Sequence, residues 1–309
     1  MSPNDGKRYQ YETVPSHEDI DVEVVEQQEV PTTTKEKATY DLSFAFKLMS
    51  ATVWGSMSLW GVWIAIFYTK AAVSDWNLFN IVFEDMNSPG YGLAFFAIAF
   101  HLIGAAYMAL AGAFQLVKYI RKTYPVYHRW VGRFYIIASL IASIGGLVFI
   151  FAKGSFGGRQ ADYAFATYGF IFLTSGMLTY YYAKQRDYDT HKLWAWRLYS
   201  LSLAGWMYRV DYYWWMVFFG AGDGSWLHNH YFQGIVDMWI NWAFYVPNLI
   251  VVEIVYRWGE SATMPSFWSR VLDASYYVIF CMSVIFSIHA SLQLFIPSIL
   301  GYYEPQWIM

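Results

Sequence analysis

The sequence has few charged residues and a single cysteine. Charged residues make up 14% of the 309 positions and hydrophobic residues 57%, whereas ordinary globular domains carry about 25% charged residues. This deficit of charge is typical of integral membrane proteins. The single cysteine, Cys281, excludes an intrachain disulfide, a CxxC redox motif and a thiolate metal cluster.

Several catalytic motifs are also missing. The sequence has no P-loop, no GxSxG or HExxH element and no dinucleotide-binding glycine fingerprint. The aspartate-rich DDxxD and DxDD elements are absent as well, which excludes the chemistry of soluble terpene synthases. We expect no metal site.

The N-terminal 41 residues differ from the rest of the chain. They hold ten acidic and four basic residues and no apolar stretch as long as that of a signal peptide. Such a polar segment cannot bury enough apolar surface to fold by itself. We therefore expect residues 1–41 to be a disordered acidic tail and residues 42–309 to form one transmembrane domain.

Seven apolar stretches are long enough to cross a bilayer, which takes about 20 mostly apolar residues. They cover residues 44–68, 91–118, 130–152, 163–183, 194–219, 231–256 and 272–296. The sequence thus predicts an all-α, polytopic transmembrane bundle with seven spans. The segment between the first two stretches, 69–90, is expected to be a surface helix or a loop.

Basic residues gather on one side of these spans. That side receives Lys118, Arg121, Lys122, Arg129, Lys184, Arg186, Lys192, Arg257 and Arg270, and the other side receives Lys70, Lys153 and Arg159. Because basic residues mark the cytoplasmic side, we expect the tail in the cytoplasm and the C-terminus across the membrane. The expected location is the endoplasmic reticulum.

A weak internal repeat opens the third and fifth stretches. The two copies are His128-Arg129-Trp130-Val131-Gly132-Arg133-Phe134-Tyr135 and His191-Lys192-Leu193-Trp194-Ala195-Trp196-Arg197-Leu198-Tyr199. Each copy places a histidine, a base, an arginine and a tyrosine at a cytoplasmic helix start. The repeat predicts duplicated helical hairpins arranged as a four-helix core.

Small residues predict which of these helices pack most closely. Ala105, Ala109 and Ala113 recur at every fourth position of the second stretch, and Ser139 and Ser143 do so in the third. Such spacing lets helix backbones approach each other in lipid.

Ionisable residues inside a span are costly and indicate functional sites. At about 1.5 Å rise per residue, five such residues share one depth, in the half of the membrane away from the cytoplasm. They are His101, Arg209, Asp211, Asp237 and His289. We expect Asp211 or Asp237 to be a catalytic proton donor, Arg209 to keep the other carboxylate ionised, and His101 to orient the donor. The structural alternative is an ion pair between Arg209 and either aspartate.

A second cluster lies at the cytoplasmic helix starts. It contains Lys192 and five further residues, His128, Arg129, Arg133, His191 and Arg197. Basic residues at this level commonly contact lipid phosphates, and Glu253 and Asp273 are their expected ion-pair partners. Helix-end amides can also make such a cluster an anion site. We count these five residues, together with Tyr208, Trp215, Trp239 and His289, as candidate substrate-binding residues.

Three of these motifs, taken in order, carry a resemblance. They are His101, His128-Arg129-x-x-Gly132-Arg133-x-Tyr135 and His191-Lys192-x-Trp194-x-x-Arg197-x-Tyr199. Over residues 91–215 this pattern resembles a widespread family of uncharacterised polytopic membrane proteins. In size, span count and aromatic content the chain also resembles the fungal membrane-bound terpene cyclases of the ascofuranone and ascochlorin type.

The second resemblance implies acid-initiated cyclisation of a prenyl chain or terminal epoxide on a meroterpenoid. The partners would be a lipophilic isoprenoid substrate and the lipid bilayer, with no cofactor and no nucleic acid. A carboxylic acid in an apolar site stays protonated and ready to donate, and aromatic faces stabilise a migrating cation.

The histidines support a different class, a transmembrane b-type cytochrome. His101 pairs by depth with His289, and His128 pairs with His191. Bis-His ligation of haem b at two levels would carry electrons across the membrane. The positions of His128 and His191 at helix ends, and not inside the spans, favour the cyclase reading.

Overall fold

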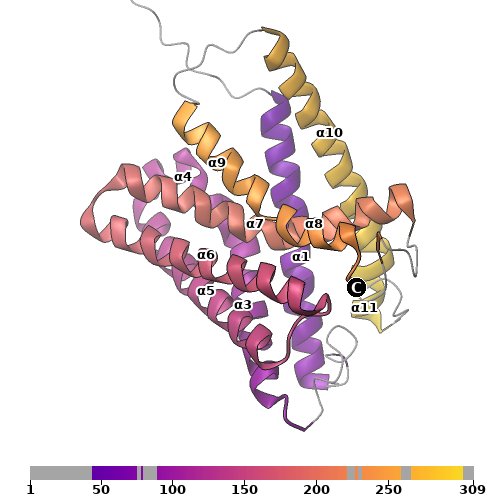
Figure 1. Ribbon diagram of the computed structural model, residues 1–309. Coiled ribbons are helices and arrows are strands. Elements are labelled where there is room, and N and C mark those ends of the chain that lie inside the picture. Colours follow the sequence, from indigo (N-terminus) through magenta and orange to yellow (C-terminus); the bar gives the residue numbers. More distant parts are fainter. Residues whose placement is uncertain are drawn as a thin grey trace, which may run out of the picture. The chain divides into compact units, whose positions relative to one another are not determined.

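The computed structural model describes residues 44–74, 78, 89–220, 227–228, 232–258 and 266–301. Within these ranges all regular secondary structure is helical (Figure 1). The predicted acidic tail and most of the 69–90 segment lie outside the described residues. The helices below all belong to the unit Leu42–Met309.

The helices follow one another with short connections in the first half of this unit. They are α1 (Phe44–Ser74), α3 (Gly92–Leu116), α4 (Lys118–Thr123), α5 (Pro125–Ala152), α6 (Gly158–Gln185) and α7 (Tyr188–Phe219). In the second half come α8 (Ile235–Ala243), α9 (Val246–Trp258) and α10 (Ser266–Ala290), then η1 (Ser291–Phe295) and α11 (Ile296–Leu300).

Five helical segments of the described chain are long and apolar enough to cross a membrane. They are Phe44–Ser74, Gly92–Leu116, Pro125–Ala152, Ile235–Ile254 and Arg270–Leu300. The other two expected spans form α6 and α7, whose lengths of about 42 and 48 Å suffice at 1.5 Å per residue. Both helices are rich in tyrosine, which lowers their hydropathy. The prediction of an all-α polytopic membrane bundle is confirmed, and five of its seven spans satisfy both length and apolarity.

Proline interrupts two of the expected continuous spans. Pro247 is the second residue of α9, directly after the turn that ends α8. Pro297 follows η1, a π-helical turn between α10 and α11. Because proline lacks an N–H and its ring clashes with the preceding turn, a regular α-helix cannot continue through either position.

Helices α3, α5, α6 and α7 form the predicted four-helix core. Helix α3 packs on α5, α5 on α6, α6 on α7, and α7 on α3 (Figure 1). The repeated motif begins in the same register in both copies. His128 and His191 are each the fourth residue of their helices, and their backbone N–H groups donate to the cap carbonyls of Tyr124 and Asp187 at 3.0 and 2.9 Å.

Glycines set the closest helix contacts in this core. A Cβ atom on Gly145 of α5 would lie 2.5 Å from the carbonyl oxygen of Ala97 of α3, and one on Gly104 would lie 2.6 Å from that of Ala138. The predicted ridge residue Ala109 packs on α1, where a Cβ on Gly61 would lie 2.8 Å from its methyl group. Backbone contact at these points requires the absence of a side chain.

Helix α7 also joins this core to the remaining helices, because it packs against α1, α8, α9 and α10 as well as α3 and α6. Trp206 of α7 donates through Nε1 to the Ser56 hydroxyl of α1 at 3.0 Å. Trp63 of α1 donates through Nε1 to the Ser298 hydroxyl of α11 at 2.7 Å. Both tryptophans are buried, so these hydrogen bonds satisfy their only polar atoms.

Gly145→Ala is expected to destabilise the fold by about 1–3 kcal/mol, since the added methyl group must push α3 and α5 apart. Gly55→Ala in α1 is the matched control, because nothing lies within 4 Å of its added Cβ. There alanine should be neutral or stabilising. Thermal unfolding of the two purified variants in detergent measures the difference, and equal melting temperatures would contradict this account of the α3–α5 contact.

Candidate functional site

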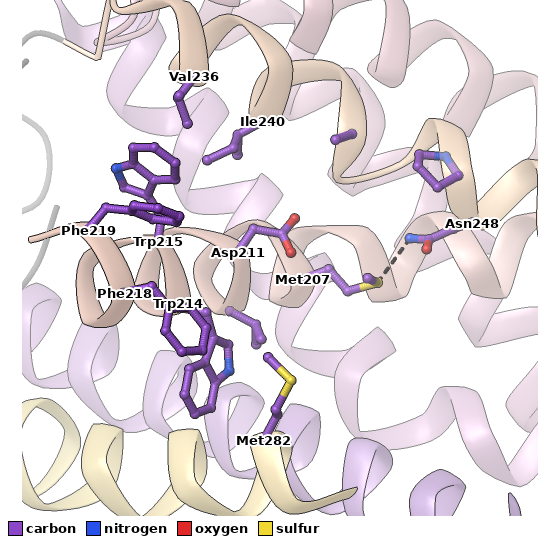
Figure 2. Close-up of a pocket in the computed structure, with 13 residues that line it drawn as sticks. Met207, Asp211, Trp214, Trp215, Phe218, Phe219, Val236, Ile240, Asn248 and Met282 are labelled. Carbon is purple, nitrogen blue, oxygen red and sulfur yellow. Dashed lines mark hydrogen bonds between the residues drawn. The ribbon is translucent and has the colours of Figure 1, made fainter. Parts of the chain in front are cut away.

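An aromatic groove of about 480 Å³ lies beside α7. We define this α7 groove by its lining residues, which are Met207, Val210, Asp211, Trp214, Trp215, Phe218, Phe219, Val236, Ile240, Ala243, Pro247, Asn248 and Met282. Helix α7 forms its floor, α8 and the start of α9 form one wall, and Met282 of α10 lies on the other side (Figure 2).

The Asp211 carboxyl group points into this groove (Figure 2). It has no hydrogen bond or ion pair with any residue that the structure describes, and it is the only acid among the lining residues. The amide of Asn248 is occupied, because its Nδ2 donates to the Phe244 carbonyl and to the Met207 sulfur. Asp211 is therefore an unpartnered acid among aromatic and aliphatic side chains.

The helical repeat explains why α7 presents this combination. Positions 207, 211, 214, 215 and 218 are three or four residues apart, so they share one face of the helix. Trp215 stacks on Phe219 at a centroid distance of 4.3 Å, and Trp214 stacks on Phe218 at 5.5 Å. The two stacked pairs form the aromatic end of the floor beside Asp211.

Asp237 lies outside the α7 groove, in a fully buried hydrogen-bond network. Its Oδ1 accepts from the Tyr212 hydroxyl at 2.8 Å and is joined to His228 Nδ1 at 2.7 Å. Its Oδ2 accepts from the Gly234 backbone N–H at 2.8 Å. The side chain thus caps the N-terminus of α8 and ties the preceding segment to α7.

The Asp237 network also orients one wall of the α7 groove. Val236 and Ile240, the neighbours of Asp237 along α8, line the groove. Gly234 permits the tight turn before α8, where an added Cβ would clash with the backbone of Leu227. The structure therefore brings one of the two candidate acids, Asp211, to the groove and places the other where it holds α8.

Arg209 forms no ion pair with any described residue, so the structural alternative of an ion pair with Asp211 or Asp237 is absent, and Arg209 does not contact the carboxylate that it was expected to keep ionised. Its Nη1 donates to the Gly205 carbonyl at 2.7 Å, and its guanidinium lies 4.5 Å from the centroid of the Trp60 ring. His101 of α3 is joined through Nδ1 to the Ala142 carbonyl of α5 at 2.7 Å. A carbonyl only accepts, so this Nδ1 carries the proton and leaves Nε2 available.

The other candidates on the same side are dispersed. Tyr208 donates to Asn241 Oδ1 at 3.1 Å, behind the groove floor. Trp239 is 74% exposed on α8 and does not line the groove, whereas Trp215 does. The His289 ring lies 5.2 Å from that of Tyr213.

The basic cluster near the starts of α5 and α7 is only partly paired. Arg197 forms the expected ion pair with Glu253 of α9 at 2.6 Å and stacks on Trp194, and Arg133 stacks on Trp130. Arg129 is exposed, and Asp273 forms no ion pair with a described residue.

The two repeat histidines differ in their partners. His191 Nδ1 donates to the Thr179 carbonyl at 2.9 Å, while the buried Nδ1 of His128 has no partner among the described residues. Before them, Asp187 caps α7 by accepting hydrogen bonds from Thr190, which lower the pKa of this exposed carboxyl. The described residues contain no group of three His, Cys, Asp or Glu side chains placed to hold a metal ion.

The sequence did not single out several residues of the α7 groove and of the Asp237 hydrogen-bond network as site residues. Met207, Phe218 and Phe219 lie at helical spacing from Asp211, so a search along that face of α7 would have found them. No periodicity links Tyr212, His228 and Gly234, because they meet Asp237 from a helix, a loop and a turn.

Asp237→Asn is expected to lower the free energy of unfolding by about 1–3 kcal/mol. The three donors bond to both carboxylate oxygens of Asp237, whereas an asparagine amide has only one oxygen that can accept. Tyr212→Phe should cost about 0.5–1.5 kcal/mol. Tyr163→Phe is the control, since the Tyr163 ring is exposed. Unfolding in detergent, followed by tryptophan fluorescence, tests this order. An Asp237→Asn variant as stable as the control would refute the anchoring role.

Comparison with known proteins gives one family. The family described as "Predicted membrane protein (DUF2306)" matches residues 98–256, from the middle of α3 to near the end of α9. No curated protein and no solved structure matches the chain. The matched segment contains the four-helix core from His101 onward, both repeat histidines, Asp211 and Asp237. Since it spans just over half of the sequence, the chain belongs to the DUF2306 family of predicted membrane proteins.

Proposed function

We propose that this chain is a membrane enzyme that protonates a lipophilic isoprenoid substrate in the α7 groove, with Asp211 as the acid. The observation that carries the proposal is the position of Asp211, an unpartnered carboxyl group in a groove of aromatic and aliphatic side chains. A carboxyl group that served only to hold helices together would have a partner. The reaction type is the cyclisation that the resemblance to membrane-bound terpene cyclases implies.

The chemistry balances as an isomerisation. The Asp211 proton passes to a terminal epoxide oxygen or an alkene carbon of the substrate. In the epoxide, the C–O bond breaks, and the π electrons of a neighbouring double bond form the new C–C bond. The last cation loses a proton, which returns to the Asp211 carboxylate and restores the acid, so the product has the same mass as the substrate.

Aromatic rings beside the acid suit such a cation. Trp214, Trp215, Phe218 and Phe219 present π faces within the same groove. These faces attract positive charge, more strongly when water is absent. The apolar lining also limits the water that would quench a carbocation.

The exposed end of α7 offers a route by which a substrate dissolved in the bilayer can enter the α7 groove. Val217, Phe218 and Phe219 are exposed at the end of α7. In a membrane, exposed apolar side chains contact lipid, so an isoprenoid dissolved in the bilayer can reach the groove laterally. The location in the endoplasmic reticulum and the cytoplasmic N-terminus belong to this proposal too.

Asp211→Asn keeps the shape of the side chain and removes its acidic proton, so it is expected to lower turnover at least a hundredfold. Asp273→Asn is the matched control, because Asp273 is a carboxylate of α10 away from the groove. The assay incubates the purified protein with a synthetic farnesyl phenol that carries a terminal epoxide. Liquid chromatography with mass spectrometry then detects a cyclised product of unchanged mass.

Two results would overturn the proposal. One is the absence of any conversion by the wild-type protein, and the other is near-native turnover by a folded Asp211→Asn variant. Loss of activity in the Asp273→Asn control would show that the effect is not specific to the groove and would count against it as well.

A second candidate function, electron transfer through haem b, draws support from the repeat histidines. His128 and His191 occupy equivalent positions on α5 and α7, which face each other across the four-helix core. The Thr179 carbonyl holds His191 Nδ1 and leaves Nε2 for a ligand, which is the usual arrangement of an iron-binding histidine.

The interior next to these histidines fits a porphyrin poorly. Two turns deeper, the Tyr135 hydroxyl donates to the Ser202 hydroxyl at 2.7 Å across the core. An added Cβ on Gly112 would lie 3.0 Å from the Tyr199 ring. Only the space at the helix ends remains, so we place this function second.

The purified protein is therefore expected to be colourless, because the core has no space for a porphyrin between Tyr135 and Ser202. A visible spectrum of protein expressed with added haem precursor tests this. A Soret band that disappears in both His128→Ala and His191→Ala would transfer the proposal to electron transfer.

A further inference from the structure

We infer that Arg209 and His101 form an oxyanion-binding site inside the bundle, separate from the α7 groove. The motivating observation is a guanidinium that lies among four helices and has no anionic partner among the described residues. Residues 209 and 211 are about 200° apart around α7. The Arg209 side chain therefore faces α1 and α3, while Asp211 faces α8 to α10.

The surroundings of Arg209 contain neutral groups. The Trp60 ring of α1 lies under the guanidinium, while Tyr68 of α1, His101 of α3, Tyr168 of α6 and Tyr208 of α7 interact with its charge electrostatically. None of these is a carboxylate. A guanidinium remains charged in proteins, so its charge needs a counter-ion that these side chains do not supply.

Most of the hydrogen-bonding capacity of Arg209 remains unused. A guanidinium has five N–H donors, and the described chain accepts one of them, through the Gly205 carbonyl. The side chain is nevertheless exposed, although α7 is covered by α1, α3 and α6 on this side. The remaining donors are thus accessible to a ligand.

The structure holds these donors in a defined position. The guanidinium lies on the face of the Trp60 ring, and that ring packs close to Gly205, where an added Cβ would be in ordinary contact with it at 3.7 Å. Folding back onto the Gly205 carbonyl, one turn earlier in α7, further restricts the side chain.

His101 adds an acceptor to the same site. Because Nδ1 donates to the Ala142 carbonyl, the neutral ring presents the lone pair of Nε2. A Cβ on Gly146 would lie 3.0 Å from Nδ1, so α5 also fixes the ring orientation. The N–H donors of the Arg209 guanidinium, together with the acceptor His101 Nε2, suit an oxyanion that keeps a proton. Examples are hydrogen phosphate, a phosphate monoester and a carboxylic head group.

The experiment measures anion binding to the full chain in nanodiscs of phosphatidylcholine. Two probes distinguish the sources of the oxyanion, radiolabelled inorganic phosphate for a free anion and oleate for the head group of an amphiphile. We expect saturable binding of at least one probe to the wild-type protein. Arg209→Gln should weaken that binding at least about tenfold, the effect of losing one charge-assisted hydrogen bond.

Two further variants make the test specific. Arg209→Lys keeps the positive charge but loses the planar pair of guanidinium N–H donors, so it should retain part of the affinity for the anion. Lys153→Gln is the matched control, because Lys153 is also a cation over an aromatic ring, 4.4 Å from the centroid of Tyr91, but lies at the end of α5. Its binding should equal that of the wild type.

The outcomes separate cleanly. Binding of phosphate alone indicates a water-soluble anion, and binding of oleate alone indicates an amphiphile from the bilayer; both support the site. Absence of binding to the wild-type protein overturns the inference even if Arg209→Gln fails to fold. Wild-type affinity in a folded Arg209→Gln variant, or equal loss in Lys153→Gln, overturns it too. None of these results depends on turnover at Asp211.

Discussion

Helix α7 runs through the middle of the bundle, where its polar side chains have protein or lipid around them and little water. Successive residues point about 100° apart, so Arg209, Asp211 and Tyr212 face three different sets of neighbours. Tyr212 reaches Asp237 at the start of α8, Arg209 lies on Trp60 of α1, and Asp211 opens onto the α7 groove. The other helices have to accommodate each of these directions.

The helices around α7 can pack closely because glycine, which has no side chain, lies at their closest contacts. Gly104 and Gly145 let α3 and α5 meet backbone to backbone, and Gly61 does the same for α1 and α3. The Trp60 ring beneath Arg209 belongs to the residue directly before Gly61 in α1. The close contacts that bring α1 and α3 together therefore also position the two residues of the proposed oxyanion site.

The different roles of the two aspartates follow from their environments. Asp237 accepts three hydrogen bonds and is fully buried, so it anchors the start of α8. Asp211 has no described partner and faces aromatic rings. Because α8 carries Val236 and Ile240 into the groove wall, the anchor determines the shape of the space in which the acid would act.

Sequence alone determined the class of protein and much of its architecture. Helix length and apolarity follow directly from local composition, and the repeat at His128 and His191 predicted the four-helix core and its register. The sequence also predicted that Glu253 pairs with the basic cluster at its level, and the structure shows that Arg197 is the partner. Depth along a span, however, does not specify the direction in which a side chain points. Only the tertiary structure separated Arg209 from both aspartates, joined Tyr212 and His228 to Asp237, and left Asp211 without a described partner, because each of these outcomes depends on residues that neighbouring helices and loops bring to that face of α7.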